Sequence, residues 1–395
     1  MFYLLVALAL AGCSADSATH PGADCPPVDL TDAPAVATCL FDRHIISAKD
    51  RDSALALFGV AESTADSFRA LGDAVSHEQS ARILRALASV TGFQSRGLFG
   101  DSARFHRIMD VVSVAIEIAE GRVPLMGAGT VRPGATPHLV WFSYPGIGVF
   151  FQPVTTVQTV AYIIPQAGMP TDSFVNIAEQ MYHYALWREV AGVRFPVWEY
   201  DFTWTSGGVT NEAPWISGMN QGVVVELFAE CFKRTGNPIW RDRAYEVLNS
   251  MKVNWSQGGV RLDDTTHGYW WEEFHPIVQV WNGSVNAVIG VGHLWEVTQD
   301  PEVKQMFDRG IEAIKYYTPQ YDTGTWTLYS RTEGLNTVGY HNVCIAMLDV
   351  LFAQTGDQWF KDTADRWRGY TPPAGVTLRS DLGLPGIFSS PPAGT

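Results

Sequence analysis

The second half of the chain alternates between long apolar stretches and helical stretches that are apolar on one face only. An apolar stretch ends at Thr235-Gly236-Asn237-Pro238 before a more charged one, and the same order recurs at Thr298-Gln299-Asp300-Pro301 and at Thr355-Gly356-Asp357. The Asn or Asp in each turn suits the N-cap of the next helix. Each unit is therefore predicted to be an apolar inner helix, a short turn and a charged outer helix. Such stacked hairpins predict a mainly α protein with a C-terminal α/α barrel (toroid) or part of one, whose inner helices line a cleft.

The first half of the chain combines helical spacing with stretches typical of strands. Apolar residues at three- and four-residue spacing predict helices at 77–90 and 103–120. Between 131 and 164, β-branched and aromatic residues broken by Pro and Gly predict three short strands. A helix is predicted at 172–190, and an extended piece at 195–204. These elements predict a smaller, β-containing region before the helical domain.

The changes of pattern divide the chain into five predicted parts. At 395 residues the chain exceeds the usual size of one simple hydrophobic core. Hydrophobic residues make up 46% and charged residues 17%, so we expect disorder only at the ends. The parts are a signal segment (1–13), a tether (14–34), an N-terminal helical and β-rich region (35–204), the α/α domain (205–372) and a tail rich in Pro, Gly and Ser (373–395).

The first residues have the pattern of an export signal. The apolar run at 2–12 is shorter than the roughly 20 residues that a membrane-spanning helix needs, and it leads directly into Cys13. Leu10-Ala11-Gly12-Cys13 resembles the bacterial lipobox, although no Lys or Arg precedes the apolar run. The resemblance implies cleavage before Cys13 and a lipid on its sulfur. We therefore expect a protein of the cell envelope that is anchored to the membrane by this lipid and faces the periplasm or the exterior.

Export also changes how the other cysteines are interpreted, because an oxidising compartment permits disulfides. Cys25 and Cys39 flank a Pro-rich loop and are candidates for pairing, whereas Cys231 and Cys344 are predicted to be buried thiols in apolar helices. No CxxC or HExxH spacing occurs, so no metal site is predicted. The net charge is −14, from 41 acids and 27 scattered bases, which argues against nucleic acid as a partner.

Two adjacent acids lie inside a run of aromatic residues at 267–286, HGYWWEEFHPIVQVWNGSVN. If this segment folds inward, at least one of Glu272 and Glu273 is partly desolvated. Desolvation raises a carboxyl pKa toward the range useful for proton transfer. The alternative is a surface turn whose aromatic side chains face the core while both acids face water.

Two further loops, 211–222 with PWISGMNQG and 321–341 (YDTGTWTLYSRTEGLNTVGYH), also precede predicted inner helices. Together with 267–286 and the closing FKDTADRWRGY, they resemble the C-terminal domain of the D-glucuronyl C5-epimerase family over roughly residues 204–370. That family of isomerases inverts glucuronate to iduronate in heparosan and heparan sulfate. The resemblance implies an anionic polysaccharide containing uronic acid as substrate, a proton swap at its carbon 5, and no cofactor.

The resemblance assigns roles to four residues. Glu273 matches the family's catalytic Glu after Trp-Glu, Tyr329 matches the Tyr that follows YDTG, and Tyr340 matches the Tyr of the Tyr-His pair that opens the next helix. These three are the catalytic candidates. Arg331 is the candidate clamp for the substrate carboxylate, because a guanidinium binds a carboxylate through two parallel hydrogen bonds.

Phe274 departs from the family pattern, because animal members have there a Tyr that belongs to the catalytic set. Phenylalanine cannot carry a proton. Either Glu273 works with one of the other tyrosines alone, or His275 substitutes, or the protein binds uronate without epimerising it. Further substrate-binding candidates in the same loops are His341, Trp215, Gln221, Asn282, Glu272 and His275.

Each candidate also has a purely structural interpretation. Tyr329 suits a core position with its hydroxyl on a carbonyl, and Arg331 suits an exposed pair with Glu333. Gln221 could instead form hydrogen bonds with buried backbone groups. The Asn282-Gly283 step is primarily the signal of a turn before a helix, and only secondarily that of a ligand-binding residue. Tyr340 and His341 could cap the N-terminus of a helix and serve only in packing.

Three functions remain open from the residues. The first is a uronate carbon-5 epimerase. The second is a polysaccharide lyase, which shares the abstraction at carbon 5 but then loses the 4-substituent. The third is a non-catalytic lipoprotein that binds uronate polymers, for which Phe274 is the main argument. Homodimers are common in the resembled family, so a homodimer is left open as well.

Overall fold

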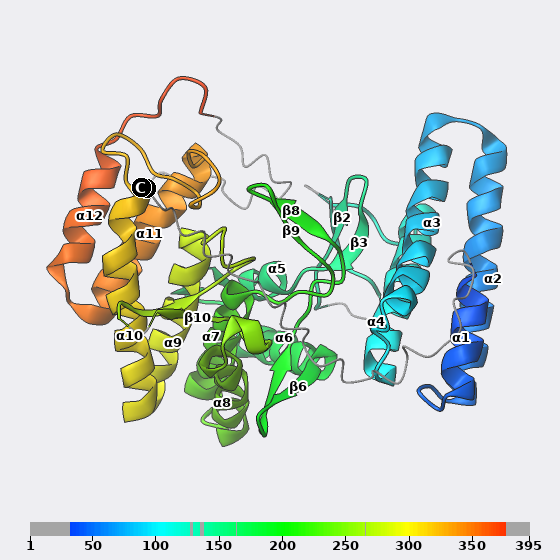
Figure 1. The fold of residues 1–395 in the computed structure, drawn as a ribbon, viewed down its shortest axis with the longest axis horizontal. Coiled ribbons are helices and arrows are strands. Elements are labelled where there is room, and N and C mark those ends of the chain that lie inside the picture. The colour runs from blue at the N-terminus through cyan, green and yellow to red at the C-terminus, as the bar shows by residue number, and fades with distance from the viewer. Residues whose placement is uncertain (1–31, 127–128, 135–137, 163, 265, 377–395) are drawn as a thin grey trace, which may run out of the picture. The chain divides into compact units, whose positions relative to one another are not determined.

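The computed structural model describes residues 32–126, 129–134, 138–162, 164–264 and 266–376 (Figure 1). The chain forms two compact units that divide between Ile116 and Glu117. None of the helices in the described ranges has the length and apolarity needed to cross a membrane.

The predicted signal segment lies outside the described residues, and lipidation of Cys13 with a place in the cell envelope stays a prediction. Cys25 is also outside them, while Cys39 is disulfide-bonded. Cys231 and Cys344 are free and buried, as predicted. The domain limits proposed from the sequence remain predictions too.

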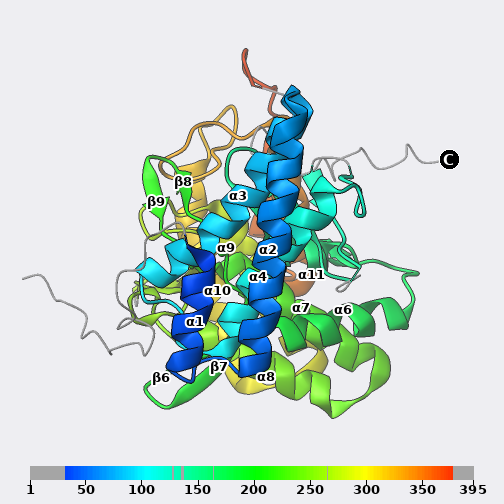
Figure 2. The same cartoon turned by 90° about the vertical axis from the view of Figure 1, so that its right-hand side faces the viewer.

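The first unit is helical. Its helices α1, α2 and α3 pack side by side (Figure 2). Gly72 adopts the left-handed conformation and ends α2. Asp73 caps the N-terminus of α3, because its side chain accepts a hydrogen bond from the backbone N–H of Ser76. The two helices predicted here are confirmed as α3 and α4. The helices are α1 (Ala33–Asp42), α2 (Ala48–Leu71), α3 (Ala74–Ser95) and α4 (Ser102–Ala119), the last of which crosses into the second unit.

The second unit begins with short strands around one short helix. An antiparallel sheet of order β1-β2-β3 forms where strands were predicted. The next segment, PVTTVQ, is helical instead, because Pro153 suits the first helical turn and the Gln152 side chain accepts from the backbone N–H of Val154. The elements are β1 (Thr130–Val131), β2 (Trp141–Tyr144), β3 (Gly148–Phe151), α5 (Pro153–Gln158), β4 (Ala161–Tyr162) and β5 (Ile164–Pro165).

The helix predicted at 172–190 is wrong at its end. The helix α6 (Thr171–Tyr184) stops early, and β6 (Leu186–Val190) pairs antiparallel with β7 (Val193–Val197). The reason is the turn between them, where Ala191 and Gly192 both have positive φ and reverse the chain.

A second hairpin follows. Strands β8 (Trp204–Ser206) and β9 (Val209–Asn211) are joined by Gly207 and Gly208, both with positive φ. This turn is pressed closely against the 321–341 loop: a Cβ added at Gly207 would lie 2.0 Å from the Thr332 hydroxyl oxygen.

The three predicted helical hairpins are confirmed, with boundaries at the predicted turns. In each turn the Thr hydroxyl donates to a carbonyl four residues back and accepts from the N–H of the capping Asn or Asp. For Thr298 these contacts are 2.7 Å to Leu294 O and 3.4 Å from Asp300 N. The repeated Thr-x-Asx pattern therefore supplies the hydrogen bonds that form each turn between an inner and an outer helix. The hairpins are α7 (Gly218–Thr235) with α8 (Pro238–Lys252), α9 (Trp281–Thr298) with α10 (Pro301–Tyr317), and α11 (Val338–Thr355) with α12 (Gln358–Arg368).

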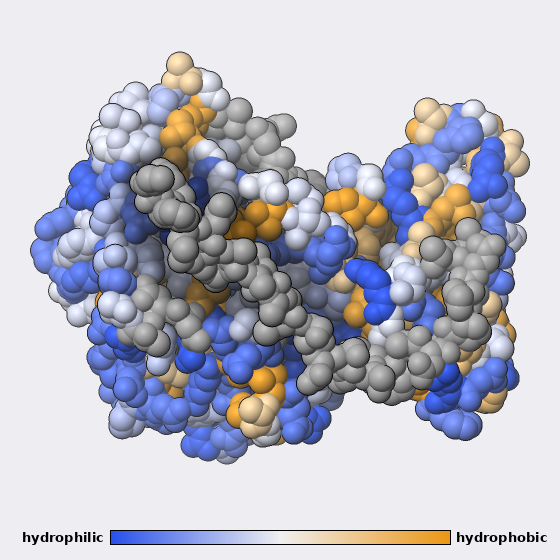
Figure 3. All heavy atoms as spheres, in the orientation of Figure 1, coloured by the Kyte–Doolittle hydropathy of each residue, from blue (hydrophilic) through white to orange (hydrophobic). Residues whose placement is uncertain are grey.

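The outer helices α8, α10 and α12 present hydrophilic surface (Figure 3), whereas α7 and α9 are buried over most of their length. Between the hairpins lie η3 (Trp255–Gln257), β10 (Arg261–Asp264) paired with β11 (Gly268–Trp271), and η4 (Thr318–Tyr321).

The inner helices α7 and α9 approach each other through glycines. A Cβ on Gly290 would lie 2.1 Å from the carbonyl oxygen of Gly222, and a Cβ on Gly222 would lie 2.3 Å from the Cα of Ala287. Only hydrogen atoms fit in these spaces, so the two backbones are in direct contact.

The predicted α/α barrel (toroid) is not confirmed, although the mainly helical class is. Helix α7 packs on α9 and α9 packs on α11, so the hairpins stack in sequence order. On its other side α7 packs against α5 and α6 instead of another hairpin. The described residues therefore form a stack of hairpins without a closed barrel.

A buried charged cluster joins α7 and α9. His293 Nε2 lies 3.0 Å from Glu230 Oε2, and Nδ1 lies 3.5 Å from Glu296 Oε2. Burial disfavours the charged imidazolium, but the hydrogen bonds to Glu230 and Glu296 and the charges of Glu226 and Glu230 outweigh it and raise the pKa of His293 to about 9. The charged His293 therefore stabilises the folded unit.

We expect His293→Gln to lower the free energy of unfolding by about 3 kcal/mol at most, and to do so mainly at low pH. The stabilisation is fully present below the unfolded pKa of about 6.5 and is lost as pH rises through about 9. Urea unfolding at pH 6 and pH 9.5 measures the difference. The exposed His183→Gln is the control. An equal loss for His293→Gln at both pH values would contradict this role.

Candidate active site

The loop after β11 places the two adjacent acids in different surroundings. Trp271 is buried, and its Nε1 donates to Met251 O at 2.8 Å. Glu272 is also buried and accepts from Trp270 Nε1 at 2.9 Å, and from two backbone N–H groups of the loop. Glu272 therefore holds the loop together from inside the core, and the structure does not place this predicted substrate-binding residue in the pocket lining.

Glu273 faces a pocket instead. Its Oε2 is buried and has no hydrogen-bond partner among the described residues. A Cβ on Gly283 would lie 2.4 Å from this oxygen, so the Asn282-Gly283 step leaves room for the carboxyl group. Burial, and then the charges of Glu272 and Glu333, raise the pKa of Glu273 to about 8. The carboxyl group thus keeps its proton to a higher pH than an exposed glutamate does and can still ionise.

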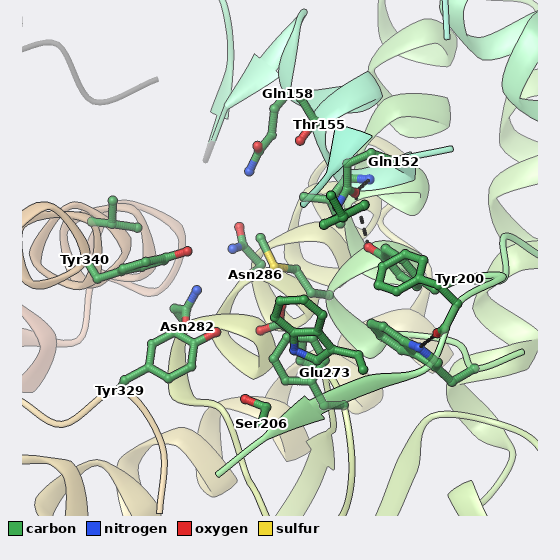
Figure 4. A pocket seen from close by; sticks show the side chains of 18 of the residues that line it. Gln152, Thr155, Gln158, Tyr200, Ser206, Glu273, Asn282, Asn286, Tyr329 and Tyr340 are labelled. Carbon is green, nitrogen blue, oxygen red and sulfur yellow. Dashed lines mark hydrogen bonds between the residues drawn. The ribbon is translucent and has the colours of Figure 1, made fainter. Parts of the chain in front are cut away.

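Tyr329 and Tyr340 form the opposite side of the same space. Both are buried, and their rings meet edge to face with centroids 5.3 Å apart. Figure 4 shows both hydroxyl groups pointing into the pocket that the Glu273 carboxyl enters. Burial, then the charge of Glu273, raise the pKa of Tyr329 well above its usual value. The structure therefore brings the three predicted catalytic residues together.

Two amides from the first turns of α9 lie between these groups. Asn282, a predicted site residue, and Asn286, one turn later, both line the pocket and are buried (Figure 4). Sequence reasoning missed Asn286. The signal was present, because residues four apart on a helix share a face and Asn282 was already a candidate.

All of the remaining wall except Ser206 comes from before the 205–372 region, and sequence reasoning did not find it. Gln152 donates to the Tyr144 hydroxyl at 3.1 Å and accepts from the Tyr200 hydroxyl at 3.3 Å. Because PVTTVQ was taken as strand, the shared face of Gln152, Thr155 and Gln158 was not recognised. The lining residues contributed by this wall are Tyr144, Gln152, Val154, Thr155, Gln158, Tyr200, Phe202, Trp204 and Ser206.

Aromatic rings complete the pocket. Trp215, predicted to line the cleft, stacks on Tyr200 with ring centroids 4.1 Å apart, and its Nε1 donates to Phe202 O at 2.9 Å. Phe274 meets Trp215 edge to face at 5.4 Å and also lines the pocket. The space is about 970 Å³, part of it open to solvent. Glu273 is the one acidic or basic side chain in the lining set, whose other polar groups are amides, hydroxyls, phenols and indoles.

Five predicted substrate-binding residues lie outside the pocket lining, namely Glu272, described above, and four others. Arg331 is exposed, and its Nη1 donates to Gln279 Oε1 at 2.8 Å, so the structure does not form the predicted carboxylate clamp. His275 packs edge-on against Trp255, with ring centroids 5.1 Å apart, so the structure does not bring it to the pocket in place of a catalytic Tyr.

The other two are held in the core. Gln221 Nε2 donates to Pro196 O at 3.0 Å and to Ser250 Oγ at 2.8 Å, which is the structural alternative considered for it. His341 stacks on Trp326 at 3.8 Å and its Nε2 hydrogen-bonds to Trp367 O at 3.1 Å. Both support neighbouring elements, and neither reaches the pocket.

Glu333 connects the β8–β9 hairpin to the loop that carries Tyr329. Its Oε1 accepts from Ser206 Oγ at 2.6 Å and from the backbone N–H of Gly207 at 3.1 Å. Ser206 itself lines the pocket. In the described ranges, no group of three or more His, Cys, Asp or Glu side chains is arranged to hold a metal ion.

The pocket is lined by aromatic rings and amides, and in it a buried carboxyl group faces two phenols. The protein therefore has a candidate acid–base site for a polar ligand. Residues 193–369 match the family described as D-glucuronyl C5-epimerase C-terminus, and this part of the chain belongs to that family. The match begins at β7 and ends after α12. It therefore includes Glu273 and both tyrosines but not α5.

Two relatives are similar over part of the chain. A D-glucuronyl C5-epimerase of Caenorhabditis elegans is 29% identical over 177 residues, which are 40% of this chain and 29% of the relative. An uncharacterized protein of Methanocaldococcus jannaschii is 23% identical over 182 residues, 45% of this chain and 58% of the relative. The chain thus spans less than two thirds of either relative. A solved GH76 alpha-mannanase of Bacteroides thetaiotaomicron covers 50% of this chain and 53% of its own at 14% identity and a TM-score of 0.35, too low to support a statement about fold or function.

Proposed function

We propose that the pocket binds a uronic acid residue of an anionic polysaccharide and inverts its carbon 5. The observation that carries the proposal is the Glu273 carboxyl group, with its pKa raised to about 8, in one pocket with the hydroxyl groups of Tyr329 and Tyr340. Epimerisation requires a base on one face of the sugar and an acid on the other. The membership of residues 193–369 in the epimerase family supports this choice of reaction.

The proposed reaction moves two protons. Ionised Glu273 takes the proton from carbon 5, and the electron pair of the broken C–H bond delocalises into the adjacent carboxylate. A tyrosine hydroxyl then gives a proton to the opposite face of carbon 5, which inverts the centre. The amides of Asn282 and Asn286 donate hydrogen bonds to the carboxylate, where negative charge builds up. Phe274 takes no part in proton transfer, so Tyr329 or Tyr340 acts alone as Glu273's partner.

The test is proton NMR of a glucuronate polymer such as heparosan, incubated with the protein in D2O. We expect the carbon-5 proton signal to disappear and iduronate signals to grow. One of Tyr329→Phe and Tyr340→Phe, the one that removes the proton-donating hydroxyl, should slow the growth of the iduronate signals by about 100-fold or more, and the other should have a smaller effect. Ultraviolet absorption from a double bond conjugated to the carboxylate would instead indicate a lyase. Binding without exchange on several uronate polymers would refute a catalytic function.

A further inference from the structure

The β8–β9 hairpin has one face toward the pocket and one face toward solvent. Ser206 and Asn211 are buried, whereas Thr205 and Thr210, which pair across the hairpin, are exposed. Ser206 lines the pocket, and so does Trp204 at the start of β8. In the described part of the chain the hairpin pairs with no other strand. It therefore covers this part of the pocket with a single layer of backbone.

The hairpin depends on contacts outside itself, because a two-stranded hairpin alone is only marginally stable in water. At its tip, Glu333 Oε1 accepts from Ser206 Oγ at 2.6 Å and from the backbone N–H of Gly207 at 3.1 Å. Hydrogen bonds to an ionised carboxylate are stronger than those between neutral groups. On β9, Val209 packs against the buried cluster that includes Tyr329. The tip is thus held by a polar contact and β9 by an apolar one.

Glu333 is itself fixed relative to Tyr329. The backbone N–H of Glu333 donates to Ser330 Oγ at 2.9 Å, and the backbone N–H of Tyr329 donates to Gly334 O at 3.1 Å. Residues 329–334 therefore form a closed turn, with the Tyr329 side chain in the pocket and the Glu333 carboxylate on the hairpin. The position of the hairpin and the position of Tyr329 are coupled through this turn.

We propose that the β8–β9 hairpin is a flap over the pocket, and that Glu333 is the positioning residue that holds this flap closed against the loop carrying Tyr329. The flap opens to admit a sugar residue of the polymer and closes over it, so that water is kept from the reacting groups. This inference rests on the proposed function for the identity of the ligand. The contacts of the hairpin carry the rest.

The first measurement is hydrogen–deuterium exchange of the backbone amides in the full chain without ligand. Glu333→Ala removes the acceptor of the Gly207 amide and should speed the exchange of a peptide covering 204–211 by about tenfold or more. Glu333→Gln keeps an oxygen that can accept the same hydrogen bonds, so it should retain most of the protection. Equal exchange in the wild type and Glu333→Ala would overturn the proposal.

The second measurement is the kinetics of carbon-5 exchange on heparosan. Glu333→Ala should raise KM by about fivefold or more and change kcat less, because the bound sugar must then supply the free energy that closes the flap. Glu333→Gln should restore most of the wild-type KM. A role in folding alone would instead lower thermal stability and leave KM unchanged. An unchanged KM in Glu333→Ala, or no restoration by Glu333→Gln, would overturn the positioning role.

The kinetics are measured at pH 9 to remove an effect of charge. Burial and the charge of Glu272, and then the charge of Glu333, raise the pKa of Glu273 to about 8. At pH 9 Glu273 is mostly ionised with or without the charge of Glu333, so the variants differ in their hydrogen bonds to the hairpin.

The matched control is Glu189→Ala in the β6–β7 hairpin, since Glu189 is exposed and lies outside the pocket lining. It should change neither the exchange of the 204–211 peptide nor KM. Thermal unfolding confirms that each variant is folded.

The two measurements also separate the flap from the proposed function. Faster exchange of the 204–211 peptide in Glu333→Ala, without carbon-5 exchange by the wild type, refutes the epimerase function and leaves the flap standing. Carbon-5 exchange by the wild type with an unchanged 204–211 peptide in Glu333→Ala does the reverse.

Discussion

Glu273→Gln should reduce carbon-5 proton exchange by about 1,000-fold or more, while the protein stays folded. Glutamine has nearly the same shape and fits the space that Gly283 leaves, but it cannot take up or release the proton. In the wild type, exchange should rise with pH up to about 8, where Glu273 becomes ionised, and then level off. The rate of deuterium incorporation measured from pH 5 to pH 9 tests both statements.

The same substitution has a predictable effect on stability. Because burial raises the pKa of Glu273 from 4.5 to about 8, only the unfolded chain releases this proton between these pH values. The wild type therefore loses stability as pH rises through that range, and Glu273→Gln does not. Urea unfolding at pH 5 and pH 8.5 should show the variant gaining relative to the wild type.

The control is the neighbouring acid. Glu272→Gln disturbs a carboxyl group that accepts from Trp270 Nε1 and two backbone N–H groups, so it should lower stability at pH 5, where Glu273→Gln should not. Because burial also raises the pKa of Glu272, to about 7, this loss should be smaller at pH 8.5. If Glu273→Gln retained exchange, or if Glu272→Gln alone abolished it without loss of stability, the assignment of the two acids would be wrong.

The second large effect concerns stability alone. Gly290→Ala should lower the free energy of unfolding by about 3 kcal/mol. The new Cβ would lie 2.1 Å from Gly222 O, a backbone atom, so α7 and α9 must separate. Alanine's higher helix propensity, worth about 1 kcal/mol, offsets only part of this cost. Denaturant unfolding of the variant and the wild type measures the difference.

The matched control is Gly59→Ala in α2, where no heavy atom lies within 4 Å of the new Cβ. Here helix propensity acts alone, and we expect a gain of about 0.5–1 kcal/mol. A Gly290→Ala variant as stable as the wild type would mean that the two helices are not packed backbone to backbone.

The features that were predictable from sequence are those set by local chemistry. The hairpin turns were found because Thr298, Asp300 and their counterparts make their hydrogen bonds within a few residues. Glu273 was found because the sequence around it resembles the Trp-Glu motif of the epimerase family, while the aromatic run alone left a solvated turn open. Neither inference required knowledge of distant contacts.

The features that were missed depend on distant contacts or on one turn. Strand β6 was taken as helix because its fate is decided by the Ala191-Gly192 turn and by pairing with β7. Arg331 was taken as a carboxylate clamp, but its side chain extends to Gln279, which belongs to another loop. The separation of Glu272 from Glu273 followed from the packing of Trp270 and Trp271, which spacing alone does not define.

The pocket's two walls come from different stretches of the chain. Glu273, Tyr329 and Tyr340 lie inside the family match at 193–369, whereas α5 lies before it. Mutations in α5 can therefore change one wall of the pocket without touching Glu273, Tyr329 or Tyr340. An expression clone limited to 193–369 would keep these three side chains but lose every lining residue that α5 and the segments before it contribute, and so leave one side of the pocket open.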